Sequence, residues 1–283
     1  MKKVMGLIVL LSSLFAGAAF AQSASYSTLE VTKDVHVVTG PGYNAMFVVT
    51  SEGVIVADSI NPEFASRMLE EIKKVTNKPV RYLVYSHNHR DHIAGGQVFK
   101  DAGAVLLSHE EAKNAILKKP HPDVAIPDFT WSGKKYALTL GDKTMELVYF
   151  GPNHGTGMTV YYLPKEKVMY LVDIVTPNRL PFTIIPDFDP DAWVSSLKKI
   201  EAIPFQIAVF SHEGPIGGRA EVVAQREYLA DLKAEILRKM NNGENVMEIP
   251  NTIQLPKYKD WLFYKEWLPM NTWRIMLGII MGY

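Results

Sequence analysis

The sequence predicts a layered α/β fold, and three observations lead to this prediction. From Thr28 onward, short β-type segments alternate with segments of helical periodicity. The chain has 283 residues, of which 47% are hydrophobic and 21% charged, so it can bury a large core and is unlike a disordered chain. The sequence contains no internal repeat and no low-complexity linker. Strand groups interleaved with helices favour sheets covered by helices.

The first elements are expected to be paired strands followed by a helix. Residues 28–60 carry valine-rich runs separated by Gly40, Gly42 and Gly53, which is typical of short strands joined by turns. Asn61-Pro62 then begins a helical spacing of apolar residues that ends near residue 79. Residues 80–85 are a compact apolar run, which predicts a buried strand.

The alternation continues through the rest of the chain. Strands are expected at residues 104–107, 136–140, 145–150, 158–162, 168–172 and 207–210, and helices near 93 and at 109–117, 191–200 and 219–240. The tail from about 258 to 283 carries Trp261, Trp267 and Trp273, three of the five tryptophans. We expect this extension to form a packed pair of helices; a substrate-pocket wall, a dimer face or a membrane-surface contact are the alternatives.

The N-terminus is typical of a signal peptide. Lys2 and Lys3 precede an apolar stretch to Phe20, and Ala19-Phe20-Ala21 is a small-residue cleavage site. We therefore expect residues 1–21 to be removed and residues 22–283 to form one exported domain, periplasmic or secreted, with no stable membrane span. A transmembrane anchor is the alternative. Without residues 1–21, 28 basic and 30 acidic residues would remain.

Charge and cysteine content exclude several classes of function. Thirty basic residues balance thirty acidic residues, so the chain lacks the basic character that binding to a nucleic acid requires. The chain has no cysteine, which excludes disulfides, thiolate metal ligands and a cysteine nucleophile. Any bound metal must therefore be held by histidine, aspartate or glutamate.

Four potential metal ligands lie within six residues after the buried strand. Residues 86–95 read Ser-His-Asn-His-Arg-Asp-His-Ile-Ala-Gly and contain His87, His89, Asp91 and His92. In an extended chain His87 and His89 project toward the same side, whereas Asp91 and His92 turn away as a helix begins. This arrangement suits two cations side by side.

Three later residues follow apolar strands in the same way: His154, Asp173 and His212. Loops at strand ends carry the chemistry of many α/β proteins, and a carboxylate in such a loop is well placed to bridge two metals. Together with the cluster, these residues supply three or four nitrogen and oxygen ligands to each ion and leave positions open for water. Open coordination positions indicate catalysis.

With these residues the chain resembles the metallo-β-lactamase superfamily, whose signature is a His-x-His-x-Asp-His run followed by a distant His, an Asp and a final His. The resemblance covers residues 31–229 and implies an αβ/βα four-layer sandwich. It also implies two Zn²⁺ ions, the first held by His87, His89 and His154, the second by Asp91, His92 and His212, with Asp173 between them. Asp58 matches the family's buried aspartate and would orient these ligands.

The function expected from this resemblance is that of a dinuclear zinc hydrolase. Metal-bound hydroxide would attack an ester, lactone, thioester or amide bond of a small molecule, and Asp91 would orient the nucleophile and transfer a proton. Arg179 is a candidate contact for a substrate carboxylate. The alternatives are an iron-dependent persulfide dioxygenase and a non-catalytic metal-binding relay protein; whether the chain forms a homodimer is left open.

Overall fold

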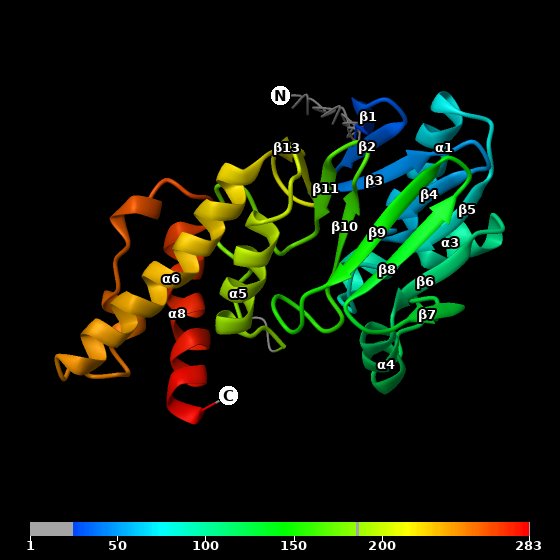
Figure 1. Ribbon diagram of the computed structural model, residues 1–283. Helices are drawn as coiled ribbons and strands as arrows, with labels where there is room; N and C mark the ends of the chain where they lie inside the picture. Colours follow the sequence, from blue (N-terminus) through cyan, green and yellow to red (C-terminus); the bar gives the residue numbers. More distant parts are fainter. Residues whose placement is uncertain (1–24, 185–186, 283) are drawn as a thin grey trace, which may run out of the picture.

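The computed structural model describes residues 25–184 and 187–282. The predicted signal peptide, residues 1–21, lies outside these ranges. Two β-sheets pack face to face, and helices cover the outer face of each sheet (Figure 1). This arrangement confirms the predicted α/β class and the four-layer αβ/βα sandwich.

The first sheet contains seven strands in sequence order. They are β1 (Ser27–Thr32), β2 (Val35–Gly40), β3 (Tyr43–Val49), β4 (Val54–Ala57), β5 (Val80–Val84), β6 (Val105–His109) and β7 (Phe129–Trp131). Strands β1 to β4 pair antiparallel, whereas β4 to β7 pair parallel. The helices between them are α1 (Pro62–Val75), α2 (Arg90–Ile93), α3 (Gly96–Asp101) and α4 (Glu110–Lys118).

The second sheet has the strand order β13-β12-β11-β10-β9-β8. Its strands are β8 (Lys135–Leu140), β9 (Lys143–Tyr149), β10 (Thr159–Leu163), β11 (Val168–Leu171), β12 (Ile207–Phe210) and β13 (Ile216–Gly217). Only the β11–β12 pair is parallel, so β9, β11 and β12 all point in one direction. The C-terminal helices are α5 (Pro190–Glu201), α6 (Arg219–Asn241), α7 (Ile249–Thr252), a 3₁₀ turn (Pro256–Tyr258) and α8 (Tyr264–Met281).

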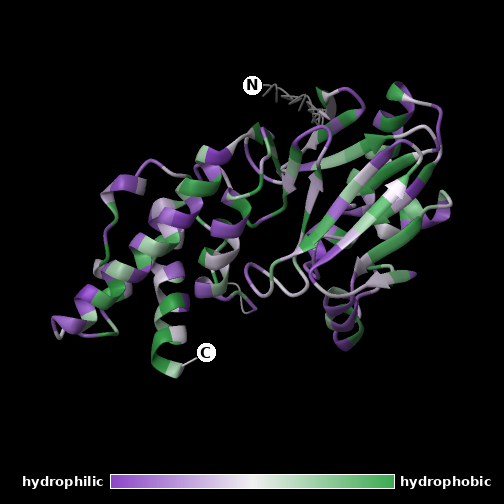
Figure 2. Ribbon diagram, in the orientation of Figure 1, coloured by the Kyte–Doolittle hydropathy of each residue, from purple (hydrophilic) through white to green (hydrophobic). Residues whose placement is uncertain are grey.

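The inner faces of the two sheets form an apolar core. Met46 and Ile55 of the first sheet meet Tyr161, Tyr170 and Val209 of the second, and all five side chains are buried. Separate apolar clusters join each sheet to its helices. Figure 2 shows hydrophobic residues along the strands of both sheets. Burial of these faces is the main free-energy term that holds the layers together.

Most predicted elements are present, and the local signals explain where they begin. For example, the Asn61 side chain accepts a hydrogen bond from the Phe64 amide and Pro62 occupies the first turn, so α1 begins where the sequence predicts. Strands β7 and β13 were not predicted; they have three and two residues, too few to show a period.

The expectation of a helix pair in the tail was wrong. The tail forms one long helix, α8, which packs against α6 and contains Pro269 in its interior. A short 3₁₀ turn and an irregular segment around Trp261 connect it to α7. Within residues 25–184 and 187–282, we find no helix with the length and apolarity needed to cross a bilayer. Trp267 nevertheless reaches a cavity, described below, as one of the alternatives anticipated.

Candidate metal centre

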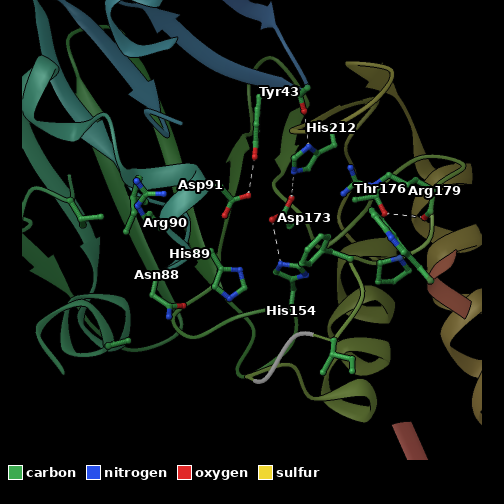
Figure 3. A pocket seen from close by; sticks show the side chains of 18 of the residues that line it. Tyr43, Asn88, His89, Arg90, Asp91, His154, Asp173, Thr176, Arg179 and His212 are labelled. Atoms are coloured by element: carbon green, nitrogen blue, oxygen red, sulfur yellow. Dashed lines mark hydrogen bonds and ion pairs between the residues drawn. The ribbon is translucent and has the colours of Figure 1, made fainter. Parts of the chain in front are cut away.

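The predicted ligands converge at one edge of the sandwich. Figure 3 labels five of them: His89, Asp91, His154, Asp173 and His212. His87 follows β5, His154 follows β9, Asp173 follows β11 and His212 follows β12. Because β9, β11 and β12 run in the same direction, their C-terminal ends meet at this edge. The parallel strand β5 delivers the cluster of residues 87–92 from the other sheet.

Asp173 lies at the centre of the site. Its Oδ2 is 2.9 Å from His92 Nε2 and 3.3 Å from His154 Nε2, while its Oδ1 is 3.0 Å from His212 Nε2. The Ser211 hydroxyl donates a hydrogen bond to Oδ1 at 2.9 Å. Asp173 adopts a left-handed backbone conformation with φ of 51°, a strain that typically persists at functional sites.

The charge of Asp173 is stabilised by its neighbours. Burial would raise the pKa of this carboxyl group, but the adjacent imidazoles of His92 and His212 hold the pKa well below its ordinary value. Asp173 is therefore an anion surrounded by histidines. A carboxylate in this position has the charge needed to bridge two cations.

Asp58 orients His87 through Ser86. The Asp58 carboxylate accepts hydrogen bonds from the Ser86 amide and the Ser86 hydroxyl, both at 2.7 Å. Since the hydroxyl gives its single proton to Asp58, it must accept the bond from His87 Nδ1 at 2.8 Å, and His87 Nε2 then carries the lone pair. Asp58 is fully buried, and its Oδ2 is also 3.6 Å from His92 Nδ1.

His212 is oriented by the turn between β2 and β3. Its Nδ1 donates to the Gly42 carbonyl at 2.8 Å, so its Nε2 lone pair points toward Asp173. The turn is held in place because the Asn44 amide donates to the Ser211 carbonyl at 2.7 Å. These bonds join the two sheets beside the site.

Asp91 differs from the other predicted ligands in its exposure. Its side chain is 51% exposed, and its Oδ2 lies 3.5 Å from His92 Nε2. The Tyr43 hydroxyl donates to the same oxygen at 3.3 Å. Tyr43 was not predicted, because a tyrosine after a glycine-rich turn carries no signal of function. Figure 3 shows that its side chain points into the site from the β2–β3 turn.

Asp187 is a second residue that sequence reasoning missed. His89 Nε2 donates to Asp187 Oδ1 at 3.0 Å, which leaves the Nδ1 lone pair of His89 available. The other oxygen of Asp187 accepts from the amide of Thr156 at 3.0 Å and from its hydroxyl at 3.1 Å. Asp187 lies in the loop before α5, 98 positions from His89, so no local pattern connects the two.

The seven predicted ligands form two groups that share one member. His87, His89, His154 and Asp173 make the first group, and Asp91, His92, Asp173 and His212 make the second. Within each group the ligand atoms all lie within 4.8 Å of one another.

Donor chemistry and burial fit a metal at these groups. Imidazole nitrogens and carboxylate oxygens are suitable ligands for zinc or iron. His87 Nε2 is buried and has no hydrogen-bond partner, a rare state that a bound cation would relieve. Burial also lowers the pKa of His87 well below its ordinary value, so its imidazole is neutral at pH 7.

The backbone at Gly155 passes so close to His87 and His89 that only glycine fits there. A Cβ atom on Gly155 would lie 2.9 Å from His87 Cδ2 and 3.1 Å from His89 Nε2. Glycine after His154 therefore allows the loop that follows β9 to pass against both imidazoles.

A cavity of about 920 Å³ opens beside the two groups. Its floor includes Asp91, Asp173 and His212, and Arg179 lies in its wall. Arg179 Nη1 is 3.3 Å from Glu213 Oε1, so the guanidinium that was expected to meet a substrate carboxylate already has an anionic partner. A role of Arg179 in substrate binding therefore stays a prediction.

Comparisons with known proteins match this chain to metal-dependent enzymes over the region that contains the candidate site. The family model "Metallo-beta-lactamase superfamily" matches residues 38–212, which contain all seven predicted ligands. The chain is 30% identical over 179 residues to the metallo-beta-lactamase type 2 of Elizabethkingia meningoseptica, covering 60% of this chain and 70% of that protein. It is 27% identical over 190 residues to the 2,4-dinitroanisole O-demethylase subunit alpha of Nocardioides sp., covering 66% of this chain and 58% of that subunit.

Among solved structures, the chain is similar to a stereoselective inverting sec-alkylsulfatase from Pseudomonas sp. The TM-score is 0.72 at 19% identity, and the match covers 91% of this chain and 51% of the sulfatase. The chain thus spans only about half to two thirds of the length of several relatives. The named relatives are all enzymes, as the sequence predicts for this chain.

Proposed function

Because the chain belongs to the metallo-beta-lactamase superfamily, we propose that it is a dinuclear zinc hydrolase acting on an ester, lactone, thioester or amide bond of a small molecule. The observation that carries this proposal is the sharing of Asp173 by the two ligand groups. A carboxylate that faces both groups lets two cations occupy one site, as in hydrolases that use two metals.

Two zinc ions held by these groups would lower the pKa of a bound water to near 7 and polarise the bond to be cleaved. The chain's own contribution is to orient the imidazoles. Ser86 orients His87, Gly42 orients His212 and Asp187 orients His89, each by a hydrogen bond to the ring nitrogen that faces away from the site. These bonds fix ring orientation and tautomer before the substrate binds.

Asp91 is the proposed proton-transfer residue. Half of its side chain is exposed to the cavity side of the site, whereas Asp58 and Asp173 are buried. A carboxylate at the cavity can orient the attacking nucleophile and hand its proton to the leaving group. The Tyr43 hydroxyl, which donates to Asp91, holds that carboxylate in position.

Metal content of the protein purified without added metal tests the proposal, measured by inductively coupled plasma mass spectrometry. We expect about two zinc ions per chain, together with hydrolysis of members of a panel of lactams, lactones, thioesters and nitrophenyl esters. About one iron per chain, with oxygen uptake on a persulfide, would replace the proposal by a dioxygenase. Absence of tightly bound metal would favour a non-catalytic relay protein.

We also propose that the protein is exported, on the evidence of residues 1–21 alone. N-terminal sequencing of the periplasmic or secreted protein should begin at Gln22. A mature protein that retains Met1 would contradict export by this route.

A further inference from the structure

The wall of the cavity above the metal centre is mostly apolar. Ile93, Ile116 and Val124 line one side. Phe182, Phe263 and Trp267 line another, together with Ile184. A volume of about 920 Å³ is within the range of cavities that hold small organic ligands.

The arginines in this wall already have partners. Arg179 is paired with Glu213 at 3.3 Å, and its guanidinium lies over the Trp267 ring, 5.5 Å from the centroid. Arg90 is ion-paired with Asp123. Among the described lining residues, the third permanent cation is Lys119, which is exposed to solvent. The wall therefore offers aromatic surface and no unpaired guanidinium to a ligand.

The C-terminal extension supplies Phe263 and Trp267 to the aromatic side, and the loop that follows Asp173 supplies Phe182. The Leu262 amide donates to the Asn178 carbonyl at 2.8 Å, and the Leu180 amide donates to the Leu262 carbonyl at 3.2 Å. These two bonds fix the extension against the loop that follows Asp173. The rings of Phe263 and Trp267 then stack with centroids 4.1 Å apart.

The aromatic side chains are too exposed to be explained by packing alone. Phe182 is 56% exposed and Phe263 is 43% exposed, and Phe182 meets Trp267 edge to face with centroids 5.3 Å apart. Exposed apolar side chains that gather at a cavity usually mark a ligand site, because isolated proteins rarely leave such a patch in water.

We propose that Phe182, Phe263 and Trp267 bind an uncharged apolar group of the substrate, an aryl group or an alkyl chain of several carbons. This inference rests on the proposed hydrolase function and specifies its substrate class: an ester with an apolar acyl or alkoxy part. The aromatic side chains hold this part while the ester group lies over the metal centre.

The test uses nitrophenyl esters and the zinc-loaded full chain. We expect kcat/KM to rise from p-nitrophenyl acetate to butyrate to hexanoate, because each buried methylene contributes about fourfold in binding. The six-carbon ester that ends in a carboxylate, mono-p-nitrophenyl adipate, should react at least about tenfold more slowly than the hexanoate. Both arginines of the wall are ion-paired, and the charge of Lys119 is exposed to solvent and therefore screened.

Two variants separate the aromatic wall from the chemistry. Trp267→Ala should reduce kcat/KM about tenfold for the hexanoate and clearly less for the acetate, which flattens the dependence on chain length. Phe129→Ala removes an equally aromatic, 46% exposed side chain on β7 outside the cavity and should change neither value. Circular dichroism and zinc content of both variants should match those of the wild type.

The outcomes distinguish this inference from the function on which it rests. If zinc-loaded protein hydrolyses no lactam, lactone, thioester or nitrophenyl ester, the hydrolase proposal fails. If it hydrolyses another member of this panel but no nitrophenyl ester, the hydrolase stands and the apolar-ester inference is wrong. If the acetate is hydrolysed but kcat/KM does not rise with chain length, or the adipate reacts faster than the hexanoate, the hydrolase stands and the apolar-substrate inference is wrong. The same holds if Trp267→Ala leaves the hexanoate-to-acetate ratio unchanged.

Discussion

His89 and Asp187 are joined by a hydrogen bond of 3.0 Å between Nε2 and Oδ1, although they come from opposite halves of the sandwich. Asp187 is in turn held by two hydrogen bonds from Thr156. The loop before α5 therefore reaches back to the histidine cluster that follows β5. A carboxylate that accepts a hydrogen bond from a histidine fixes the orientation of the imidazole ring and makes the ring more basic. We therefore expect the Asp187 contact to increase metal affinity at His89.

Asp187→Ala should weaken zinc binding by about tenfold to a hundredfold, because His89 loses the partner that orients its ring. Competition with a chromogenic chelator measures this affinity. The matched control is Asp189→Ala, two residues away, which removes the N-cap of α5 and should cost about 1 kcal/mol of stability without changing zinc affinity. Equal zinc affinities in the two variants would contradict a role for Asp187 in orienting His89.

Asp91→Ala should reduce turnover by about a thousandfold or more, because the variant loses both a ligand oxygen and the proposed proton-transfer group. The side chain is half exposed, so the fold should persist with an unchanged circular dichroism spectrum. Steady-state kinetics on the best ester of the panel provides the measurement. Wild-type rates in this variant would favour the relay protein over the enzyme.

Tyr43→Phe should lower kcat roughly tenfold, since Asp91 loses a hydrogen-bond donor at 3.3 Å while the ring is retained. Tyr136→Phe removes a hydroxyl on β8 outside the cavity and serves as the control. The Tyr43 proposal predicts a larger effect on kcat than on zinc content. An unchanged kcat would show that the Tyr43 hydroxyl does not position the Asp91 carboxylate for catalysis.

Removal of metal should lower the melting temperature by roughly 5–10 °C, because ions that bind only the folded chain stabilise it by a few kcal/mol. Differential scanning fluorimetry with and without a chelator measures the shift, and added zinc should reverse it. In Asp173→Ala, which removes the carboxylate shared by both ligand groups, the shift should be smaller than in the wild type, because only the three histidines of the first group still form a complete site. If the chelator leaves the melting temperature of the wild type unchanged, bound metal does not stabilise the folded chain.

The pH dependence of stability should reveal a contact between two turns. The Ser51 amide donates to the Asp142 carboxylate at 2.6 Å and lowers the pKa of that carboxyl group below its ordinary value. Since the pKa is lower in the folded chain, the ionised carboxylate stabilises the fold above the unfolded pKa of about 4, and the contribution disappears as pH falls through the folded pKa.

Asp142→Asn retains an acceptor and removes only the charge. In urea titrations with chelator present throughout, its unfolding midpoint should lie below that of the wild type at pH 6 and approach it toward pH 3. A difference that stays constant over this range would exclude ionisation of Asp142 as the cause.

The family, the layered architecture and the residues predicted as metal ligands could all be read from the sequence alone. Those signals are local: the spacing of His87, His89, Asp91 and His92 after an apolar strand, and single ligands directly after three further strands. Because parallel strands end at the same edge of a sheet, strand direction places such residues together independently of loop conformation. The strands and helices were predictable for the same reason, since periodicity extends over several consecutive residues.

The side chains that support the predicted ligands, and those that line the cavity, could be identified only in the folded chain. Asp187, Tyr43 and the pairing of Arg179 with Glu213 depend on loops that meet across the sandwich, and no short-range pattern encodes such meetings. The single helix α8 likewise follows from packing against α6, because the tryptophan-rich tail has no clear amphipathic period. The candidate ligands could be recognised because their signals are local. Their surroundings could not, because long-range contacts between loops are set by packing of the whole chain.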